Sequence, residues 1–276
     1  MTTKPASTAR SADPQDEVSA LGRGLTILRV VADHNEPLSH SELARLTGMP
    51  KATVSRLIAT LVNHGHLRLQ RGSDRYELAP GVLDLGNAYL RNFDLRTSIR
   101  PFLSELAEFS GATVHLAVRD RFDMVLIDTV RPDSGMVFSR LDVGARLNIC
   151  TSAIGRGYLR LLPLAERTAL LNSARIAAAN EWARMSSGVE AALNEADKLG
   201  FCTSMGEWHP LVNSIGAGFT GPRGVRYAFN CGGPAFVFSR ETLVEHVGPR
   251  MLQCLQIIEQ EIGGRQGTEP LAPPSK

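Results

Sequence analysis

Residues 39–69 combine apolar side chains at helical spacing with a polar opposite face. The apolar residues recur at positions i, i+3, i+4 and i+7, and they are Val54, Leu57, Ile58 and Leu61. This spacing predicts an amphipathic helix with one buried stripe. The opposite face is small, hydroxyl-bearing or basic, and it comprises Ala52, Ser55, Arg56, Ala59 and Thr60. A helix of this shape fits a DNA major groove, where Lys51, Thr53 and Arg56 would reach bases or phosphates.

The residues on either side of this helix predict a helix-turn-helix followed by a hairpin. Ser39 stands three residues before Glu42, as in a capping box, so a first helix should begin there and bury Leu43 and Leu46. Gly65 should end the second helix. Residues 67–78 (LRLQRGSDRYEL) then alternate like a β-hairpin with Gly-Ser-Asp at its tip.

A hairpin in this position is a wing, and its arginines are expected to follow the DNA backbone or an adjacent minor groove. The sequence therefore predicts a winged helix-turn-helix that binds double-stranded DNA. The predicted DNA-contacting residues are Ser39, Lys51, Ala52, Thr53, Ser55, Arg56, Thr60, Arg68, Arg71 and Arg75. A small packing domain with a solvated basic edge, or a winged helix used for protein contacts, is the alternative.

Helical spacing continues on both sides of this module. Residues 18–34 predict a helix in which Leu21, Leu25, Leu28 and Val31 follow one another at helical spacing. Residues 81–97 predict a linker helix with Val82, Leu85 and Tyr89 on one side, a face suited to pairing with a second copy of the chain. Residues 1–17 are polar and aperiodic and predict a disordered tail, and residues 265–276 are expected to form a flexible tail.

From Thr113 the hydrophobic period changes from 3.6 to two, which predicts strands. The expected strands cover residues 113–120, 124–130, 136–141, 214–221 and 224–233. The expected helices cover residues 96–110, 152–162, 163–174, 187–200 and 239–264, the second of them beginning near Ser152. Helices flanking an antiparallel sheet make an α+β domain, suited to sensing a small molecule.

Composition and charge favour a globular DNA-binding protein. The chain has 276 residues, which suggests about two domains, and a net charge of +2. Residues 18–80 carry an excess of +3, whereas acidic and basic residues cancel over 81–265. No stretch approaches the roughly 18 apolar residues of a membrane helix, and the N-terminus lacks the apolar core of a signal peptide, so a cytoplasmic location is expected.

Candidate chemistry elsewhere is sparse. Four cysteines, Cys150, Cys202, Cys231 and Cys254, are scattered without a C-x-x-C pair, so they are expected to be reduced and structural or pocket-lining. A metal- or redox-responsive cysteine site is the alternative. His115 is expected to be a core or rim histidine on a strand. No G-x-S-x-G, H-E-x-x-H or Walker motif is present, so neither an enzyme nor a cofactor is predicted.

Taken together, the chain resembles the isocitrate lyase regulator (IclR) family of bacterial transcription factors over about residues 20–262. The phrases that carry the resemblance are SELARLTGMPKATVSRLIATLVNHGHL, RYELAPGVLDLGNAYL, TVHLAVRDRFDMVLIDTV, GARLNICTSAIGRGYL, LGFCTSMGEW, NSIGAGF and AFNCGGP, in this order. The resemblance implies a winged helix at 18–80, a dimerising linker helix at 81–97 and a GAF-like effector-binding domain at 98–264. It also implies homodimers or tetramers acting near genes for the catabolism of organic or aromatic acids.

The resemblance further implies an effector pocket, in which the start of a helix at Thr151 to Ile154 would bind a carboxylate through backbone N–H groups. The pocket residues carried over are Met136, Leu147, Ser152, Ala153, Ile154, Ser204, Ser214, Asn230 and Gly232. Asn230 and Gly232 should share one face of a strand while Cys231 points to the other. The chain departs from the family pattern at Cys150, where His is common, and at Arg156, where Lys is common. These departures leave the identity of the ligand open.

Overall fold

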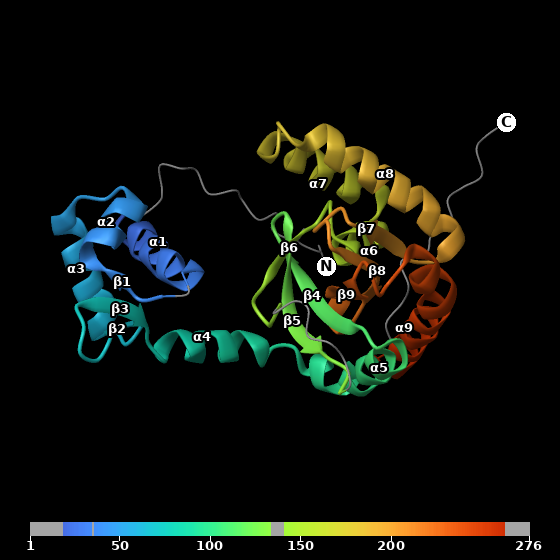
Figure 1. Cartoon of the computed structure of the whole chain (residues 1–276), viewed down its shortest axis with the longest axis horizontal. Coiled ribbons are helices and arrows are strands. Elements are labelled where there is room, and N and C mark those ends of the chain that lie inside the picture. Colours follow the sequence, from blue (N-terminus) through green and yellow to red (C-terminus); the bar gives the residue numbers. More distant parts are fainter. Residues whose placement is uncertain (1–18, 35, 134–140, 263–276) are drawn as a thin grey trace, which may run out of the picture. The chain divides into compact units, whose positions relative to one another are not determined.

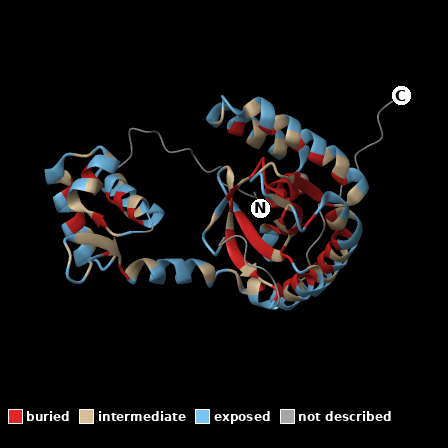
Figure 2. Cartoon of the chain, viewed as in Figure 1, coloured by how far each residue is buried: buried red, intermediate tan, exposed pale blue. Residues whose placement is uncertain are grey.

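The chain divides into two compact units, Met1–Asn92 and Phe93–Lys276. The computed structural model describes residues 19–34, 36–133 and 141–262 (Figure 1). Each unit has its own buried core (Figure 2). The predicted tails and nearly all of the strand predicted at 136–141 lie outside the described residues. Within the described residues, none of the helices has the length and apolar character needed to cross a bilayer.

The first unit is a winged helix-turn-helix. Its elements are α1 (Ser19–Asp33), β1 (Leu38–Ser39), α2 (His40–Thr47), α3 (Lys51–Asn63), β2 (Leu67–Leu69), β3 (Arg75–Leu78) and α4 (Gly81–Leu90). The strands form a small antiparallel sheet in the order β1-β3-β2. The capping box at Ser39 is confirmed, because its hydroxyl accepts from the Glu42 N–H and its own N–H donates to the Glu42 carboxylate. The core draws on α1, α2, α3 and β2 through Ile27, Leu43, Val54 and Leu67.

Burial in this unit follows the apolar spacing only in part. The apolar residues noted on α1 do not share one buried face, because its buried positions are Gly24, Ile27 and Val31, whereas Leu21 and Leu25 are 64% and 47% exposed. On α2 the predicted burial is confirmed for Leu43 and wrong for Leu46, which is 36% exposed. Spacing fixes which residues share a helix face, but neighbouring helices decide which of two adjacent faces is covered.

The predicted helix over 81–97 is interrupted. Helix α4 ends at Leu90, and the next helix, α5 (Asp94–Ser110), begins only after Phe93, whose φ and ψ of −111° and 64° are not helical. Helix α4 starts against the turn that follows α3, because the Gly81 N–H donates to the Gly65 carbonyl at 3.0 Å. Most of α4 is exposed, including Leu83 and Leu85.

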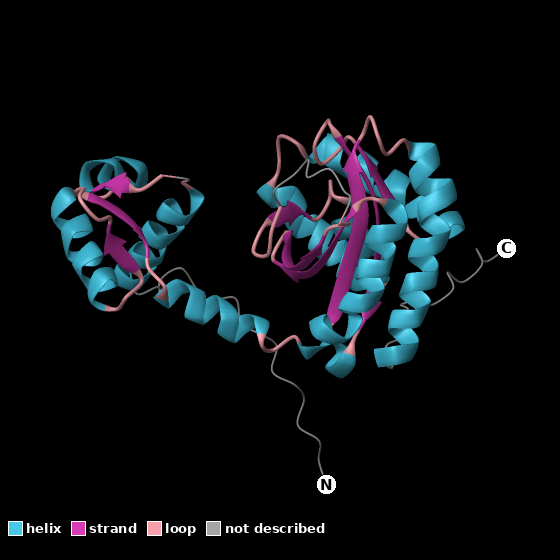
Figure 3. Cartoon of the chain, turned by 60° about the horizontal axis from the view of Figure 1, so that its bottom comes forward, coloured by secondary structure: helices cyan, strands magenta, loops and turns pink. Residues whose placement is uncertain are grey.

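The second unit contains a six-stranded antiparallel sheet in the order β6-β5-β4-β9-β8-β7. Figure 3 shows its strands in magenta with helices in cyan beside them. Its strands are β4 (Thr113–Asp120), β5 (Asp123–Val130), β6 (Arg146–Asn148), β7 (Cys202–Met205), β8 (Val212–Thr220) and β9 (Arg226–Pro234). The two predicted hairpins are present as β4–β5 and β8–β9. The edge strands β6 and β7 were not predicted, since segments of three and four residues carry too little alternation to be recognised.

Helices cover both faces of this sheet. Helices α5 and α9 (Gly248–Ile262) pack together on one face, and a π-helical segment at Thr242–Val247 leads into α9. Helices α6 (Ala153–Leu161), α7 (Leu164–Ala177) and α8 (Trp182–Leu199) lie on the other. Cys231 points toward α5, where its Sγ lies 3.3 Å from Ser110 Oγ. Its neighbours Asn230 and Gly232 face the opposite side, as the alternation predicts.

Candidate functional sites

Helix α3 exposes the face that the sequence assigns to DNA. Val54 and Ile58 are buried. The side chains at 51, 52, 55, 56 and 60 are exposed and Thr53 is half-buried. Ser55 is not entirely free to contact a partner, since its Oγ lies 2.7 Å from His40 Nε2 on α2. The outward face therefore presents Lys51, Ala52 and Arg56 with little bulk between them.

The three wing arginines differ in what already holds them. Arg68 pairs with Glu77 across the hairpin at 2.7 Å. Arg75 pairs with Glu42 at 3.1 Å and donates to the Pro37 carbonyl at 2.7 Å, so it ties the wing to the start of α2. Arg71, at the exposed tip, makes no ion pair with any described residue. Ser39, also predicted to contact DNA, has its hydroxyl in the capping box.

In the second unit, glycines bring α6 directly against the sheet. A Cβ added at Gly216 of β8 would lie 2.4 Å from the carbonyl oxygen of Ala153, and one at Gly157 would lie 2.8 Å from the Ala217 nitrogen. Contacts that close are possible only without side chains. The first turn of α6 is thereby fixed over β8, where Ser152 caps it by accepting from the Gly155 N–H.

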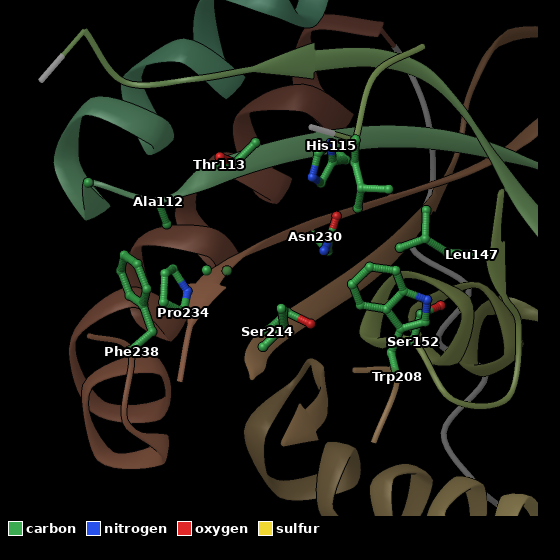
Figure 4. A pocket seen from close by; sticks show the side chains of 15 residues that line it. Ala112, Thr113, His115, Leu147, Ser152, Trp208, Ser214, Asn230, Pro234 and Phe238 are labelled. Atoms are coloured by element: carbon green, nitrogen blue, oxygen red, sulfur yellow. The ribbon is translucent and has the colours of Figure 1, made fainter. Parts of the chain in front are cut away.

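A pocket opens on this face of the sheet, enclosing about 630 Å³ including its open mouth (Figure 4). Strands β4, β6, β8 and β9, the cap of α6 and the β7–β8 loop contribute to its wall. The lining includes five predicted residues, Leu147, Ser152, Ser214, Asn230 and Gly232. None of its described lining residues carries a Lys, Arg, Asp or Glu side chain.

Three predicted pocket residues do not line this cavity, and a fourth is not described. Ala153 and Ile154 are completely buried between α6 and the sheet. Ser204 is also buried, and its hydroxyl donates to the Thr151 carbonyl at 2.7 Å, so it holds the loop before α6. Met136 lies outside the described residues.

The pocket also contains residues that the sequence did not indicate as ligand contacts. His115 on β4, Trp208 in the β7–β8 loop and Phe238 after β9 all line it (Figure 4). His115 carried a usable signal, since it alternates with Thr113 and Ala117 on a predicted strand. Trp208 and Phe238 stand in loops, where no periodicity indicates direction.

His115 is 6% exposed, and its Nδ1 lies 3.1 Å from the Thr129 hydroxyl on β5. Burial and, to a smaller extent, the nearby charge of Arg131 lower the pKa of His115 to about 4, while the charge of Asp142 opposes this. The imidazole is therefore neutral at neutral pH.

An ion pair between a buried arginine and a half-buried glutamate supports the Trp208 side of the pocket. Arg156, only 1% exposed, donates to the carbonyls of Cys150 and Thr203 at 2.8 and 2.7 Å. Its guanidinium also contacts both carboxylate oxygens of Glu207, with Nη1 at 2.7 Å from Oε1. Because Glu207 directly precedes Trp208, this fork fixes the loop that carries the indole.

The cysteines do not gather into a site. All four are buried and free. Burial raises the pKa of the Cys150 thiol to about 11, and those of Cys202, Cys231 and Cys254 to about 12. Thiols with such pKa values are poor nucleophiles at neutral pH. Among the described residues, no group of three His, Cys, Asp or Glu side chains could hold a metal ion.

A winged helix with an exposed basic face, joined in one chain to a pocketed α+β unit, defines the class of transcription regulators that couple a DNA-binding helix-turn-helix to an effector domain. The IclR helix-turn-helix domain matches residues 20–71, and the bacterial transcriptional regulator IclR C-terminal domain matches residues 87–259. The chain belongs to the IclR family. It is a transcription regulator and not an enzyme.

Individual relatives agree with this assignment. The chain is 30% identical over 248 residues to the HTH-type transcriptional regulator TsaQ1/TsaQ2 of Comamonas testosteroni, covering 89% of this chain and 88% of that one. It is similar to the crystal structure of an IclR family regulator from Brucella abortus, with 37% identity, a TM-score of 0.77 and coverage of 92% and 96%. It also shares its fold with an IclR homologue from Microbacterium hydrocarbonoxydans that was crystallised with 4-hydroxybenzoate, with 16% identity, a TM-score of 0.69 and coverage of 88% and 99%.

Proposed function

We propose that this regulator binds a specific operator through α3 and the wing. The observation that carries the proposal is the exposed face of α3, which is small at Ala52 and cationic at Lys51 and Arg56. Arg56 is suited to bidentate hydrogen bonding with a guanine edge, and small neighbours let the helix approach the base pairs. Lys51, Thr53, Ser55 and Thr60 flank it, and Arg71 at the wing tip provides a cation for the backbone.

The effector is a small organic carboxylate bound in the pocket of the second unit. The described lining has no cationic side chain, so the start of α6 is the positive element available to an anion. Ser152 caps this helix through the Gly155 N–H and lines the pocket, so the partial positive charge of the first turn is presented there, although Ala153 and Ile154 are themselves buried against the sheet. Leu147 and Trp208 supply apolar wall. The 4-hydroxybenzoate complex of a protein with the same fold supports this class of ligand.

The two activities are coupled through dimers. Helix α4 connects the units along the chain, and its exposed Leu83 and Leu85 offer an apolar surface for a second copy. A two-fold dimer places two reading helices on half-sites about one turn of DNA apart. Effector binding that changes how the second units pair would change this spacing and thereby the operator affinity. Pairing of dimers into tetramers is compatible with the same scheme.

The test begins with selection of operator sequences from a randomised duplex library by the full-length protein. Fluorescence anisotropy with the selected duplex is then repeated while a panel of aliphatic and aromatic acids is titrated, and thermal unfolding identifies which acids bind. The expected result is a selected, two-fold related sequence whose affinity falls steeply with salt and changes when a stabilising acid is added. A protein that selects no sequence, or whose binding acids leave operator affinity unchanged, contradicts the proposal.

A further inference from the structure

One polar group in the pocket lacks the partner that burial demands. Asn230 on β9 is 6% exposed and lines the cavity, and its Oδ1 has no hydrogen-bond partner among the described residues. Leaving a buried amide oxygen without a hydrogen bond is unfavourable, because the oxygen gives up its contacts with water and gains no donor in return. A buried acceptor facing a cavity is therefore a site where a ligand donor would be bound favourably.

His115 stands directly opposite. In the antiparallel pairing of β4 with β9, His115 is in register with Asn230. Both side chains line the same pocket (Figure 4). Directly opposed residues on one face of a sheet have Cβ atoms about 4.5–5.5 Å apart, so one small group can touch both. The neutral imidazole already uses Nδ1 toward the Thr129 hydroxyl, which leaves Nε2 for a ligand.

We propose that His115 and Asn230 together bind a hydroxyl group of the effector, so that the effector is a hydroxylated organic acid. This rests on the proposed effector function of the pocket. A hydroxyl is both donor and acceptor, and it can donate to Asn230 Oδ1 while accepting from the His115 Nε2–H. The Thr129 hydroxyl then donates to His115 Nδ1 and fixes the ring proton on Nε2.

Other ligand groups fit this pair less well. A second carboxylate offers only acceptors and would face the lone pairs of Asn230 Oδ1 without any cationic side chain in the described lining to balance it. A methyl group or hydrogen at the same place would leave the amide oxygen unpaired. Sites built to hydrogen-bond a substrate hydroxyl reject analogues that lack it much more strongly than apolar pockets reject extra methylenes.

The test uses pairs of acids that differ only in a hydroxyl group, titrated calorimetrically into the full-length protein at pH 7.5. The probes are benzoate with its three monohydroxy isomers, and propionate with 2- and 3-hydroxypropionate. At least one hydroxy acid should bind tenfold or more tightly than its parent. Asn230→Leu and His115→Phe should each bring the members of that pair to within about threefold of each other. Asn230→Asp, which keeps an acceptor oxygen, should retain part of the preference.

Cys231→Ser is the matched control, because residue 231 is flanked by two lining residues but points to the other face of the sheet. It should keep the full preference. Operator binding and circular dichroism establish that each variant is folded. Equal affinity within every pair, a preference that survives both substitutions, or no binding of any probe overturns the hydroxyl subsite.

The same titrations separate this inference from the proposed function. If acids bind and change operator affinity without any preference for a hydroxyl group, the hydroxyl subsite is contradicted and the proposed function is supported. A hydroxyl preference that depends on His115 and Asn230, with no effect on operator affinity, would confirm the subsite and contradict the function.

Discussion

Helices α3 and α6 each lie at a candidate binding site, but they differ in how much of their surface is exposed to solvent. Of the 13 residues of α3, only Val54 and Ile58 are buried, and one whole face is free. Helix α6 buries eight of its nine residues. A helix that contacts an extended partner such as DNA must keep a face outside the core. A helix that holds a small anion can be enclosed, because its first turn supplies the donors.

This difference predicts how each site responds to substitution. Changes on the outer face of α3 should alter binding and leave stability unchanged, since these side chains have few neighbours. Changes around α6 should alter stability and binding together, since the helix lies in van der Waals contact with the sheet on which the pocket is built. The predictions below test that contrast in order of expected size.

The largest effect is expected from Gly216→Val. A Cβ there would lie 2.4 Å from the Ala153 carbonyl oxygen, so α6 must move from the sheet or the second unit must unfold. We expect the free energy of unfolding of this unit to fall by about 3 kcal/mol or more. Denaturant titration monitored by tryptophan fluorescence measures it, because Trp182 and Trp208 both lie in this unit. The control is Gly86→Ala on α4, where an added Cβ would meet no atom within 4 Å beyond its own helix backbone and a change below about 1 kcal/mol is expected. Similar effects of the two substitutions would contradict the close packing of α6.

The next effect is a loss of stability in acid. The pKa of His115 lies at about 4 in the folded protein and near 6.5 in the unfolded chain, because burial disfavours the charged ring. The unfolded state therefore binds the extra proton first as pH falls. The contribution of His115 to the free energy of unfolding is therefore fully present above pH 6.5 and is lost as the pH falls from about 6.5 to 4. The free energy of unfolding should decrease by on the order of 3 kcal/mol over this range.

His115→Gln should flatten that part of the pH profile of the second unit's unfolding free energy. Parallel profiles for the variant and the wild-type protein would show that His115 is not the titrating group.

A smaller effect is expected from Glu207→Gln. The amide keeps one acceptor oxygen but removes the negative charge and the second acceptor, so the buried Arg156 guanidinium loses the carboxylate it pairs with and keeps its two carbonyl acceptors. A wholly buried ion pair costs about 3–5 kcal/mol to break. Because Glu207 is 37% exposed, we expect about 2 kcal/mol and a looser loop.

The readout is Trp208 fluorescence in a Trp182→Phe background, where it becomes the only tryptophan. A shift of its emission to longer wavelength, together with weaker effector binding, is expected. An unchanged emission maximum would mean that the ion pair does not hold the indole in the pocket wall.

The smallest effect concerns the wing. Arg71→Ala should weaken operator binding uniformly across sequences and lower the slope of log affinity against log salt by about 1. Arg68→Ala should do less, since Arg68 already pairs with Glu77. Arg175→Ala, an exposed cation on α7, is the charge-matched control. Equal salt-dependence slopes for Arg71→Ala and this control would show that the wing tip does not contact the DNA.

Local features of the fold could be predicted from sequence because they depend on neighbouring residues. The capping box needs only Ser39 and Glu42, and the turn ending α5 needs only Gly111, whose φ is 67°. Strand alternation likewise placed Asn230 and Gly232 on one face. Features that depend on which elements meet were harder to predict. The exposure of Leu21 and Leu25 depends on where α2 and α3 lie, and periodicity contains no such information.

The pocket shows the same division. Ser152 and Ser214 were predicted because the family resemblance identifies the segments that carry them. Trp208 was not, because its position depends on an ion pair between Glu207 and a residue 51 positions earlier. Ser204 was placed in the pocket by the resemblance, but its hydroxyl is used within the fold. Alternation identified the right strand faces and could not say which positions on them a neighbouring loop covers.

The central claim is that α3 contacts DNA and that the second unit adjusts this contact. The most direct measurement compares wild-type protein with Arg56→Ala for affinity to the selected operator, to a scrambled duplex and to the effector. Loss of one base contact should weaken operator binding by about 1–3 kcal/mol and reduce selectivity over the scrambled duplex. Effector affinity should stay unchanged. Undiminished operator binding, or equal loss of operator and effector binding, would contradict the account.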